Sequence, residues 1–405
     1  MKKNVFALFL SLAAFALLVG CGGGGGGSSS PTVGSLKLNI VDDNNAPVSG
    51  ATIKINDETK TESTSTHLRE NVAAGKAFIK VSKTGYLATM KYEPVATGYT
   101  TVATVSLVLT SGNIMAKTIN LTVAQPNVEF KEGNENRVTI DFPALVGATA
   151  AQNVEVFHNQ PADNKDVVAF PGVFMGVPTG QTDEVPFETY GYINVNLNGA
   201  SIPEGKVATV TIYCDADTAV VAPPATMPLW YFNETEQKWK QEGNATWDST
   251  LKAYVAQVSH FSWYNLDRPL GNDVQTMEVY VASYTQTYDH ENWEAAPDLT
   301  TATPRIPGCK VTIKASFANT GDWEAENSGW AGNFFNDASW SDSQVTDSNG
   351  KVTFTNIPAG RSIQVDVVSP DGEERSGGSY YVKNDGSAYM IVNYGSFSHG
   401  TFNRK

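Results

Sequence analysis

The sequence predicts an all-β protein made of tandem antiparallel β-sandwich domains. Short segments that alternate apolar and polar residues recur along the chain, rich in Thr, Val, Ile and Tyr, and clusters of Gly, Asn, Asp and Pro separate them. No apolar pattern with the helical period extends beyond about two turns. Short strands at regular spacing, with no helices between them, are typical of antiparallel sandwiches.

The first 20 residues are expected to be an export signal rather than part of the fold. Lys2 and Lys3 precede an apolar run from Val5 to Val19, which is shorter than the roughly 20 residues that a membrane-spanning helix needs. Cys21 follows directly after Leu18-Val-Gly20, and in this order the segment resembles a bacterial lipoprotein signal. The resemblance implies cleavage before Cys21 and acyl chains on that cysteine. The alternative is an ordinary secreted protein in which the cysteine is incidental.

Residues 21–34 are expected to tether the folded chain to a bilayer, which would be its first partner. Two or three acyl chains on Cys21 would make a lasting anchor. The stretch Gly22 to Ser30 has no apolar residue to bury and should stay disordered. Position 22 is a glycine and not the aspartate that resembles an inner-membrane retention signal. If the source has an outer membrane, the protein is therefore expected to lie there, in the cell envelope.

The composition excludes some partners and bounds the number of domains. The chain has 42 acidic and 28 basic residues, a net charge of −14, and no block of basic residues, which argues against nucleic acid as a partner. About 370 residues remain after the tether, enough for two to four domains. Cys214 and Cys309 are expected to lie in different domains as small buried hydrophobes, so no disulfide framework is predicted.

Residues 35–110 are predicted to form the first sandwich. Leu36 to Ile40 alternates, Asp42 to Asn45 turns the chain, and Val48 to Ile55 alternates again before the strand Ala73 to Val81. This order resembles a carboxypeptidase regulatory-like domain, a small transthyretin-like sandwich. The acidic turn lacks the spacing of a hand-type calcium loop, so a solvated hairpin turn is favoured over a metal site.

Residues 274–405 repeat that theme and are predicted to form a second regulatory-like sandwich. Gly308 to Lys314 corresponds to the second alternating segment of the first sandwich. Asn349-Gly350 supplies the positive φ of a tight hairpin, after which Val352 and Phe354 should face the core.

An insertion at residues 316–344 is expected between two strands of this last sandwich, and it is the best candidate for ligand contact. It carries Trp323, Trp330 and Trp340 among Gly, Asn and Asp. Exposed tryptophans stack well on the apolar faces of sugar rings, and the wider fold group that the sandwich resembles is regarded as carbohydrate-binding-like. If these rings are exposed, a glycan or an envelope protein would be the partner. The alternative is that these rings cover a sheet or pack on a neighbouring domain.

Residues 111–269 are predicted to form a sheet-rich middle domain that gathers its aromatics on one face. Met227 to Asn233, Trp239 and the triplet His260-Phe261-Ser262 resemble a ZU-type domain. Some relatives of that family break their own backbone between the Phe and the Ser of this triplet.

The resemblance therefore implies a candidate self-cleavage site. On a strained turn, the Ser262 hydroxyl could attack the Phe261 carbonyl with help from His260. The alternative is that His260 and Phe261 close the core while Ser262 faces outward.

Other catalytic layouts lack support in the sequence. The five histidines show no metal-ligand spacing, and neither a nucleophile elbow nor a phosphate-binding glycine loop occurs. No cofactor or metal is expected. The favoured function is a non-enzymatic surface lipoprotein that displays its loops, and the alternative is a self-processing module.

Overall fold

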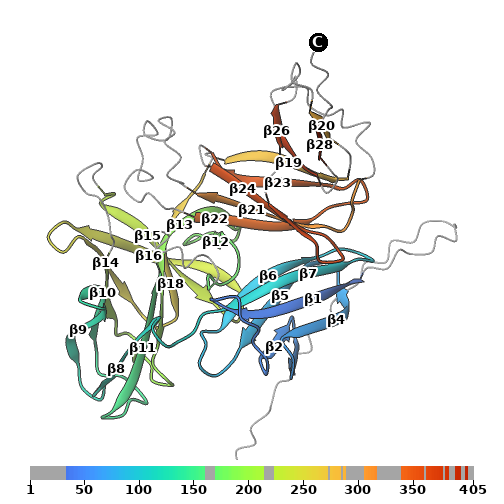
Figure 1. Cartoon of the computed structure of the whole chain (residues 1–405). Helices are drawn as coiled ribbons and strands as arrows, with labels where there is room; N and C mark the ends of the chain where they lie inside the picture. Colours follow the sequence, from blue (N-terminus) through green and yellow to red (C-terminus); the bar gives the residue numbers. More distant parts are fainter. Residues whose placement is uncertain are drawn as a thin grey trace, which may run out of the picture.

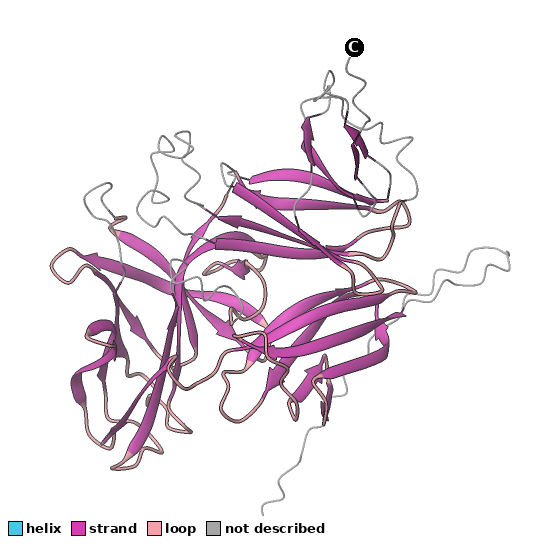
Figure 2. Ribbon diagram, in the orientation of Figure 1, coloured by secondary structure: helices cyan, strands magenta, loops and turns pink. Residues whose placement is uncertain are grey.

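The computed structural model describes residues 33–159, 169–213, 223–271, 274–283, 286–288, 305–316, 339–359, 362–376, 379–382, 388–393 and 397–399. Every regular element in these residues is a strand, in several sheets (Figures 1 and 2), which confirms the all-β tandem sandwich prediction. The described residues contain no helix long and apolar enough to cross a membrane. Cys21, Cys214, Trp323 and Trp330 lie outside the described residues.

The first domain packs two sheets face to face, in the orders β4-β1-β7 and β3-β2-β5-β6. Leu36, Leu38 and Ile40 are buried on alternate positions of the first strand, as the sequence predicts, and they meet Ile53 from the opposite sheet. Its strands are β1 (Val33–Asp42), β2 (Thr52–Ile55), β3 (Glu58–Thr61), β4 (Thr66–Ala73), β5 (Gly75–Ser82), β6 (Thr89–Val95) and β7 (Thr100–Leu107).

The acidic turn after β1 is a solvated turn. The Asp42 carboxylate accepts hydrogen bonds from the backbone N–H groups of Asn44 (2.9 Å) and Ala46 (2.8 Å). This use of an aspartate side chain to close a turn is common. No cluster of metal ligands is found among the described residues.

The third domain repeats the connectivity of the first. β19 pairs with β23 antiparallel and with β27 parallel, just as β1 pairs with β4 and β7. The opposite sheet runs β22-β21-β24-β25, which matches β3-β2-β5-β6. Its strands are β19 (Val274–Ala282), β20 (Gln286–Tyr288), β21 (Lys310–Ser316), β22 (Ser339–Val345), β23 (Lys351–Pro358), β24 (Ser362–Val368), β25 (Glu374–Ser376), β26 (Ser379–Val382), β27 (Ala388–Asn393) and β28 (Phe397–His399).

Two expectations for this repeat need correction. The sandwiches are not purely antiparallel, because in each the first strand pairs in parallel with a later one. The predicted insertion also extends too far, since its residues 339–344 belong to β22, which pairs with β21 along its whole length. Residues 341–344 of β22 are all polar, so this strand does not stand out from a loop in the sequence.

The turn at Asn349-Gly350 is present, but it joins β22 and β23, which lie in different sheets, rather than two paired strands. Gly350 has a φ of +62° and Asn349 does not have a positive φ. Val352 and Phe354 are buried beyond it, as predicted.

Replacing Gly350 with alanine is expected to lower the free energy of unfolding by about 1–3 kcal/mol. A Cβ here would lie 2.7 Å from the Val281 carbonyl oxygen as well as in the left-handed region. Gly180→Ala is the matched control, because its φ is +76° but no atom lies within 4 Å of the added Cβ. Urea titration should show a clearly larger loss of the free energy of unfolding for Gly350→Ala than for Gly180→Ala. Equal losses would mean that the close contact with the Val281 carbonyl oxygen has no effect on stability.

The middle domain is one continuous sheet that folds back on itself. In sheet order it runs from β9 through β10, β14, β17, β16, β15, β18, β13 and β11 to β8, and residues from both ends share one core cluster. Its strands are β8 (Ile114–Ile119), β9 (Gln125–Glu132), β10 (Glu135–Phe142), β11 (Gln152–Asn159), β12 (Met175–Val177), β13 (Val185–Asn196), β14 (Ala208–Tyr213), β15 (Thr226–Asn233), β16 (Lys238–Asp248), β17 (Ala253–Val258) and β18 (Trp263–Pro269).

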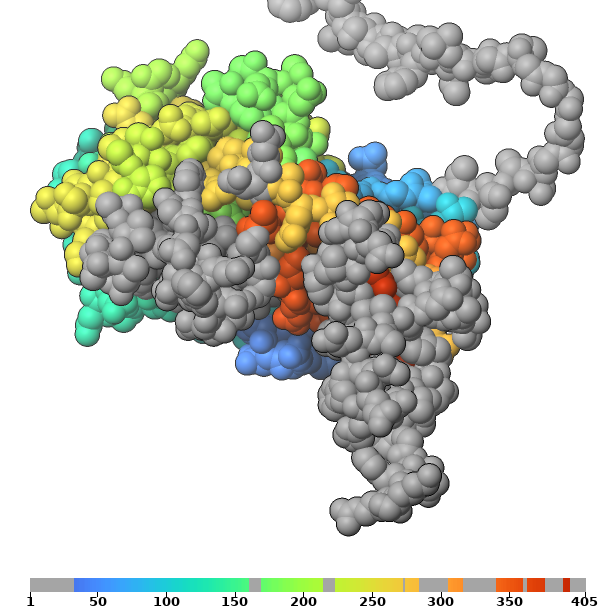
Figure 3. Space-filling view, turned by 90° about the horizontal axis from the view of Figure 1, so that it is seen from above, coloured from blue at the N-terminus to red at the C-terminus, as the bar shows by residue number. Residues whose placement is uncertain are grey.

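A second core cluster crosses the domain boundaries. It contains Phe78 and Met90 of the first domain, an aromatic group from the middle domain that includes Trp230 and Trp239, and the core of the third domain around Phe354. In Figure 3 the middle domain (green to yellow) and the third (orange to red) lie against each other, and the first (blue) adjoins them. The aromatic face predicted for the middle domain is therefore a joint between domains.

Candidate functional site

The triplet His260-Phe261-Ser262 lies in the bend between β17 and β18. Its three side chains point to different neighbours. The Phe261 ring packs on Phe142, with ring centroids 5.5 Å apart, at the edge of the middle core. The His260 ring meets Tyr231 edge-on at 4.6 Å.

His260 belongs to a polar cluster that the sequence did not predict. The Nδ1 atom of His260 lies 3.6 Å from Oε1 of Glu242, and the same oxygen accepts a 2.6 Å hydrogen bond from the Ser259 hydroxyl. The Tyr264 hydroxyl lies 2.8 Å from Oε2 of Glu242 and 2.7 Å from the His260 carbonyl oxygen, so its one proton bonds to one of them. These contacts fix the bend.

The electrostatics of this cluster follow from burial and hydrogen bonding. Burial alone would raise the pKa of Glu242, but hydrogen bonds from its neighbours, led by His260, outweigh it, so the pKa of this carboxyl lies below its ordinary value. Burial first, and then the negative charge of Glu242, raise the pKa of the Tyr264 phenol. Glu242 is therefore an anion that accepts hydrogen bonds near neutral pH.

Ser262 is not joined to His260. Its hydroxyl donates a hydrogen bond to the Phe232 carbonyl at 3.1 Å, and its own carbonyl accepts one from the Val195 N–H at 3.2 Å. None of the three triplet residues has a positive φ. In the part of the chain that the structure describes, no base lies within hydrogen-bond reach of the Ser262 hydroxyl, and both sides of Ser262 are held by neighbouring strands.

Phe261 and Ser262 also line a groove between the first and middle domains, with a volume of about 410 Å³. Tyr86 lies on the first-domain side, and Asn194 and Glu155 lie on the middle-domain side. An ion pair between Lys80 and Glu234 crosses the same boundary at 2.7 Å.

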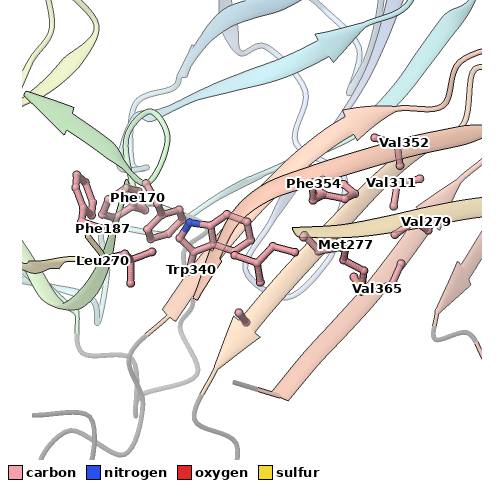
Figure 4. Close-up of a cluster of buried hydrophobic side chains, with 14 of the residues drawn as sticks. Phe170, Phe187, Leu270, Met277, Val279, Val311, Trp340, Val352, Phe354 and Val365 are labelled. Atoms are coloured by element: carbon pink, nitrogen blue, oxygen red, sulfur yellow. The ribbon is translucent and has the colours of Figure 1, made fainter. Parts of the chain in front are cut away.

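Trp340 is not an exposed ligand contact, which corrects one of the three tryptophans predicted for that role. Its side chain is 4% exposed and belongs to the shared core. Figure 4 places its ring between Phe170 and Leu270 of the middle domain and Phe354 of the third. Both faces of a buried ring are occupied, so no sugar can stack on it, and the packing alternative holds for this residue.

A cavity of about 270 Å³ lies where the three domains meet, and we call it the junction cavity. Four lysines line it, Lys76 and Lys91 from the first domain and Lys310 and Lys314 from the third. Phe170, in the middle-domain segment 170–174, lies at its wall, and the Trp239 indole N–H donates to the Pro171 carbonyl at 2.8 Å to hold that segment.

A buried ion triad links the first and third domains at this cavity. Glu93, 1% exposed, has Lys91 Nζ at 2.7 Å from one carboxylate oxygen and Lys310 Nζ at 2.5 Å from the other. Burial alone would raise the pKa of Glu93, but Lys310 and Lys91 outweigh it and hold that pKa below its ordinary value. Burial lowers the pKa of Lys310, and Glu93 offsets only part of that effect.

Sequence reasoning missed the triad and the cavity. Lys310 appears in the sequence as an outward residue between the core positions Cys309 and Val311. It is buried only because that outer face of β21 covers another domain. The one local signal is that Lys91 and Glu93 share a face of β6, which does not reveal a partner more than 200 residues away.

Cys309 is a buried thiol, as predicted, and it is free. Burial raises its pKa to about 12, so it stays protonated and unreactive near neutral pH.

Comparison with known proteins gives structural likeness only. No family model and no curated protein matches the chain. Among solved structures it is similar to the major pilin subunit BcpA of Bacillus cereus (9% identity, 91% of this chain and 100% of that one, TM-score 0.16). It is also similar to the pilin SpaD of Corynebacterium diphtheriae (8% identity, 92% and 98%, TM-score 0.18) and to a membrane-associated protein of unknown function from Bacteroides fragilis (9%, 58% and 98%, TM-score 0.17). At TM-scores this low, the likeness supports no conclusion about function.

Proposed function

We propose that the chain is a non-enzymatic, lipid-anchored protein of the cell envelope whose three sandwiches act as one rigid body. The observation that carries this proposal is the core cluster shared by all three domains. A large apolar joint opposes the domain motion that is otherwise the default for chains of modules. Such a body holds its distal loops in a fixed arrangement relative to one another.

The anchor and the domain families belong to the same proposal. Cys21 would carry the acyl chains, and the glycine-rich stretch behind it would let the body move near the lipid surface. The proposal includes two regulatory-like sandwiches, at residues 35–110 and 274–405, around a ZU-type domain at 111–269. The strand connectivity that the first and third domains share supports the assignment of the two sandwiches to one family. Trp323 and Trp330 are proposed to contact a glycan or an envelope protein.

Replacing Cys21 with serine is expected to move the protein from the membrane fraction to the soluble fraction, because serine cannot form the thioether. Membrane fractionation and incorporation of labelled palmitate measure this. Ser28→Ala, in the same tether, is the matched control and should stay with membranes. A Cys21→Ser protein that still sediments with membranes and carries label would contradict the anchor.

The self-cleavage alternative is less well supported, because the Ser262 hydroxyl bonds to Phe232 and His260 faces Glu242. We therefore expect wild-type protein to run as one intact band on a denaturing gel after prolonged incubation. Ser262→Ala should run identically. Two fragments that end at Phe261 and begin at Ser262 in wild type, and vanish in the variant, would establish cleavage and overturn the non-enzymatic assignment.

A further inference from the structure

We propose that the junction cavity binds a small ligand that carries an oxyanion, a carboxylate or a phosphate, on a body about the size of one sugar residue. This inference does not depend on the lipid anchor. It rests on the charges that line the cavity, on the buried triad at its wall, and on the other groups that face it.

The charge around the cavity is opposite to that of the chain. The whole sequence has 42 acidic and 28 basic residues. Among the described residues, the cavity is lined by four lysines and by two carboxylates, Glu93 and Asp342. A concave site with a net positive charge concentrates anions, so this cavity attracts anions within an otherwise anion-repelling protein.

The triad leaves one positive charge in excess at the cavity wall. Lys91 and Lys310 together carry two positive charges against one on Glu93, and their side chains are 25% and 11% exposed. Partial burial weakens the solvation of this excess charge by water. An anion in the cavity would supply its counter-charge.

Two further lysines can reach a ligand by giving up a weak ion pair. Lys76 lies 3.3 Å from Asp342, and Lys314 lies 3.4 Å from Asp366, both long for charge-assisted hydrogen bonds. Their side chains are 50% and 46% exposed. Exposed ion pairs of this kind are weak, so either lysine can exchange its partner for a bound oxyanion at little cost in stability.

The remaining lining suits a hydroxylated ring. The hydroxyls of Thr312 and Ser343, 2.8 Å apart, face the cavity from the third domain. Phe170 and Phe174 stack 4.3 Å apart and supply an apolar wall. A volume of about 270 Å³ is below the usual range for drug-sized ligands and fits one small molecule.

Isothermal titration calorimetry on the full-length protein in detergent tests the site with glucuronate, glucose 6-phosphate and glucose. We expect one or both charged sugars to bind at least roughly tenfold more tightly than glucose, with affinity that falls as salt rises. The two charged probes separate a carboxylate from a phosphate ligand. Binding by neither, or equal binding of glucose, would overturn the proposal.

Variants place the binding in the cavity. Lys76→Gln and Lys314→Gln should each weaken binding of the charged sugar roughly threefold to tenfold with unchanged thermal stability. Lys206→Gln, an exposed lysine of the middle domain outside the cavity lining, is the matched control and should bind like wild type. Binding that both cavity variants leave unchanged, or that Lys206→Gln weakens equally, would show that the anion sits elsewhere.

Discussion

Replacing Glu93 with glutamine is expected to lower the free energy of unfolding by about 3–5 kcal/mol, because it leaves the buried Lys310 and its neighbour Lys91 without their anion. The loss should appear in urea titration as a lower midpoint. Since the triad joins the first and third domains, the variant should also expose that boundary to protease before the rest of the protein.

A triple replacement separates the ion triad from the space that it fills. Glu93→Leu with Lys91→Met and Lys310→Met puts apolar groups of similar size at all three positions, and such exchanges are often neutral or stabilising. The triple variant should therefore be more stable than Glu93→Gln. A loss below about 1 kcal/mol for Glu93→Gln would mean that water screens the pair as it does on a surface.

The pH dependence of stability follows from the same carboxyl. The pKa of Glu93 is lower in the folded protein than its ordinary 4.5. Its contribution is therefore fully present above pH 4.5 and is lost as the pH falls through the folded pKa. Glu93→Gln should lack this part of the acid-induced loss, and an identical acid profile for both proteins would contradict it.

Replacing Trp340 with alanine is expected to lower the free energy of unfolding by about 3–5 kcal/mol. The ring fills the joint between the middle and third domains, so its removal leaves a cavity that rigid sheets on both sides cannot close. Trp340→Phe keeps most of the contact and should lose clearly less.

Leu251→Ala is a suitable surface control for this series, because Leu251 is 44% exposed. It should change stability by less than about 0.5 kcal/mol. If Trp340→Ala were equally mild and instead abolished binding to an envelope glycan, Trp340 would be the ligand contact that the sequence suggested.

The fold was predictable wherever one strand carries its own signal. The alternation of Leu36, Leu38 and Ile40 and the turn before Val352 needed no knowledge of the partner strand. The end of the aromatic insertion was not predictable, because residues 341–344 of β22 are all polar and show no apolar alternation.

The candidate sites divide in the same way. The triplet at 260–262 was visible as a motif, but its partner Glu242 lies on β16 and is brought close only by sheet pairing. Lys310 and Glu93 each look like solvated surface residues in sequence. Their burial arises from the packing of one domain on another. The alternation of apolar and polar residues within a strand does not show which face of that strand another domain covers.

Scanning calorimetry of the full-length protein tests the single rigid body most directly. A core shared by three domains predicts one unfolding transition in which the ratio of the calorimetric to the van't Hoff enthalpy is about 1. The Trp340→Ala variant should shift that whole transition to lower temperature. Two or three separate transitions in wild type, or a shift confined to one of them, would show that the sandwiches unfold as independent domains.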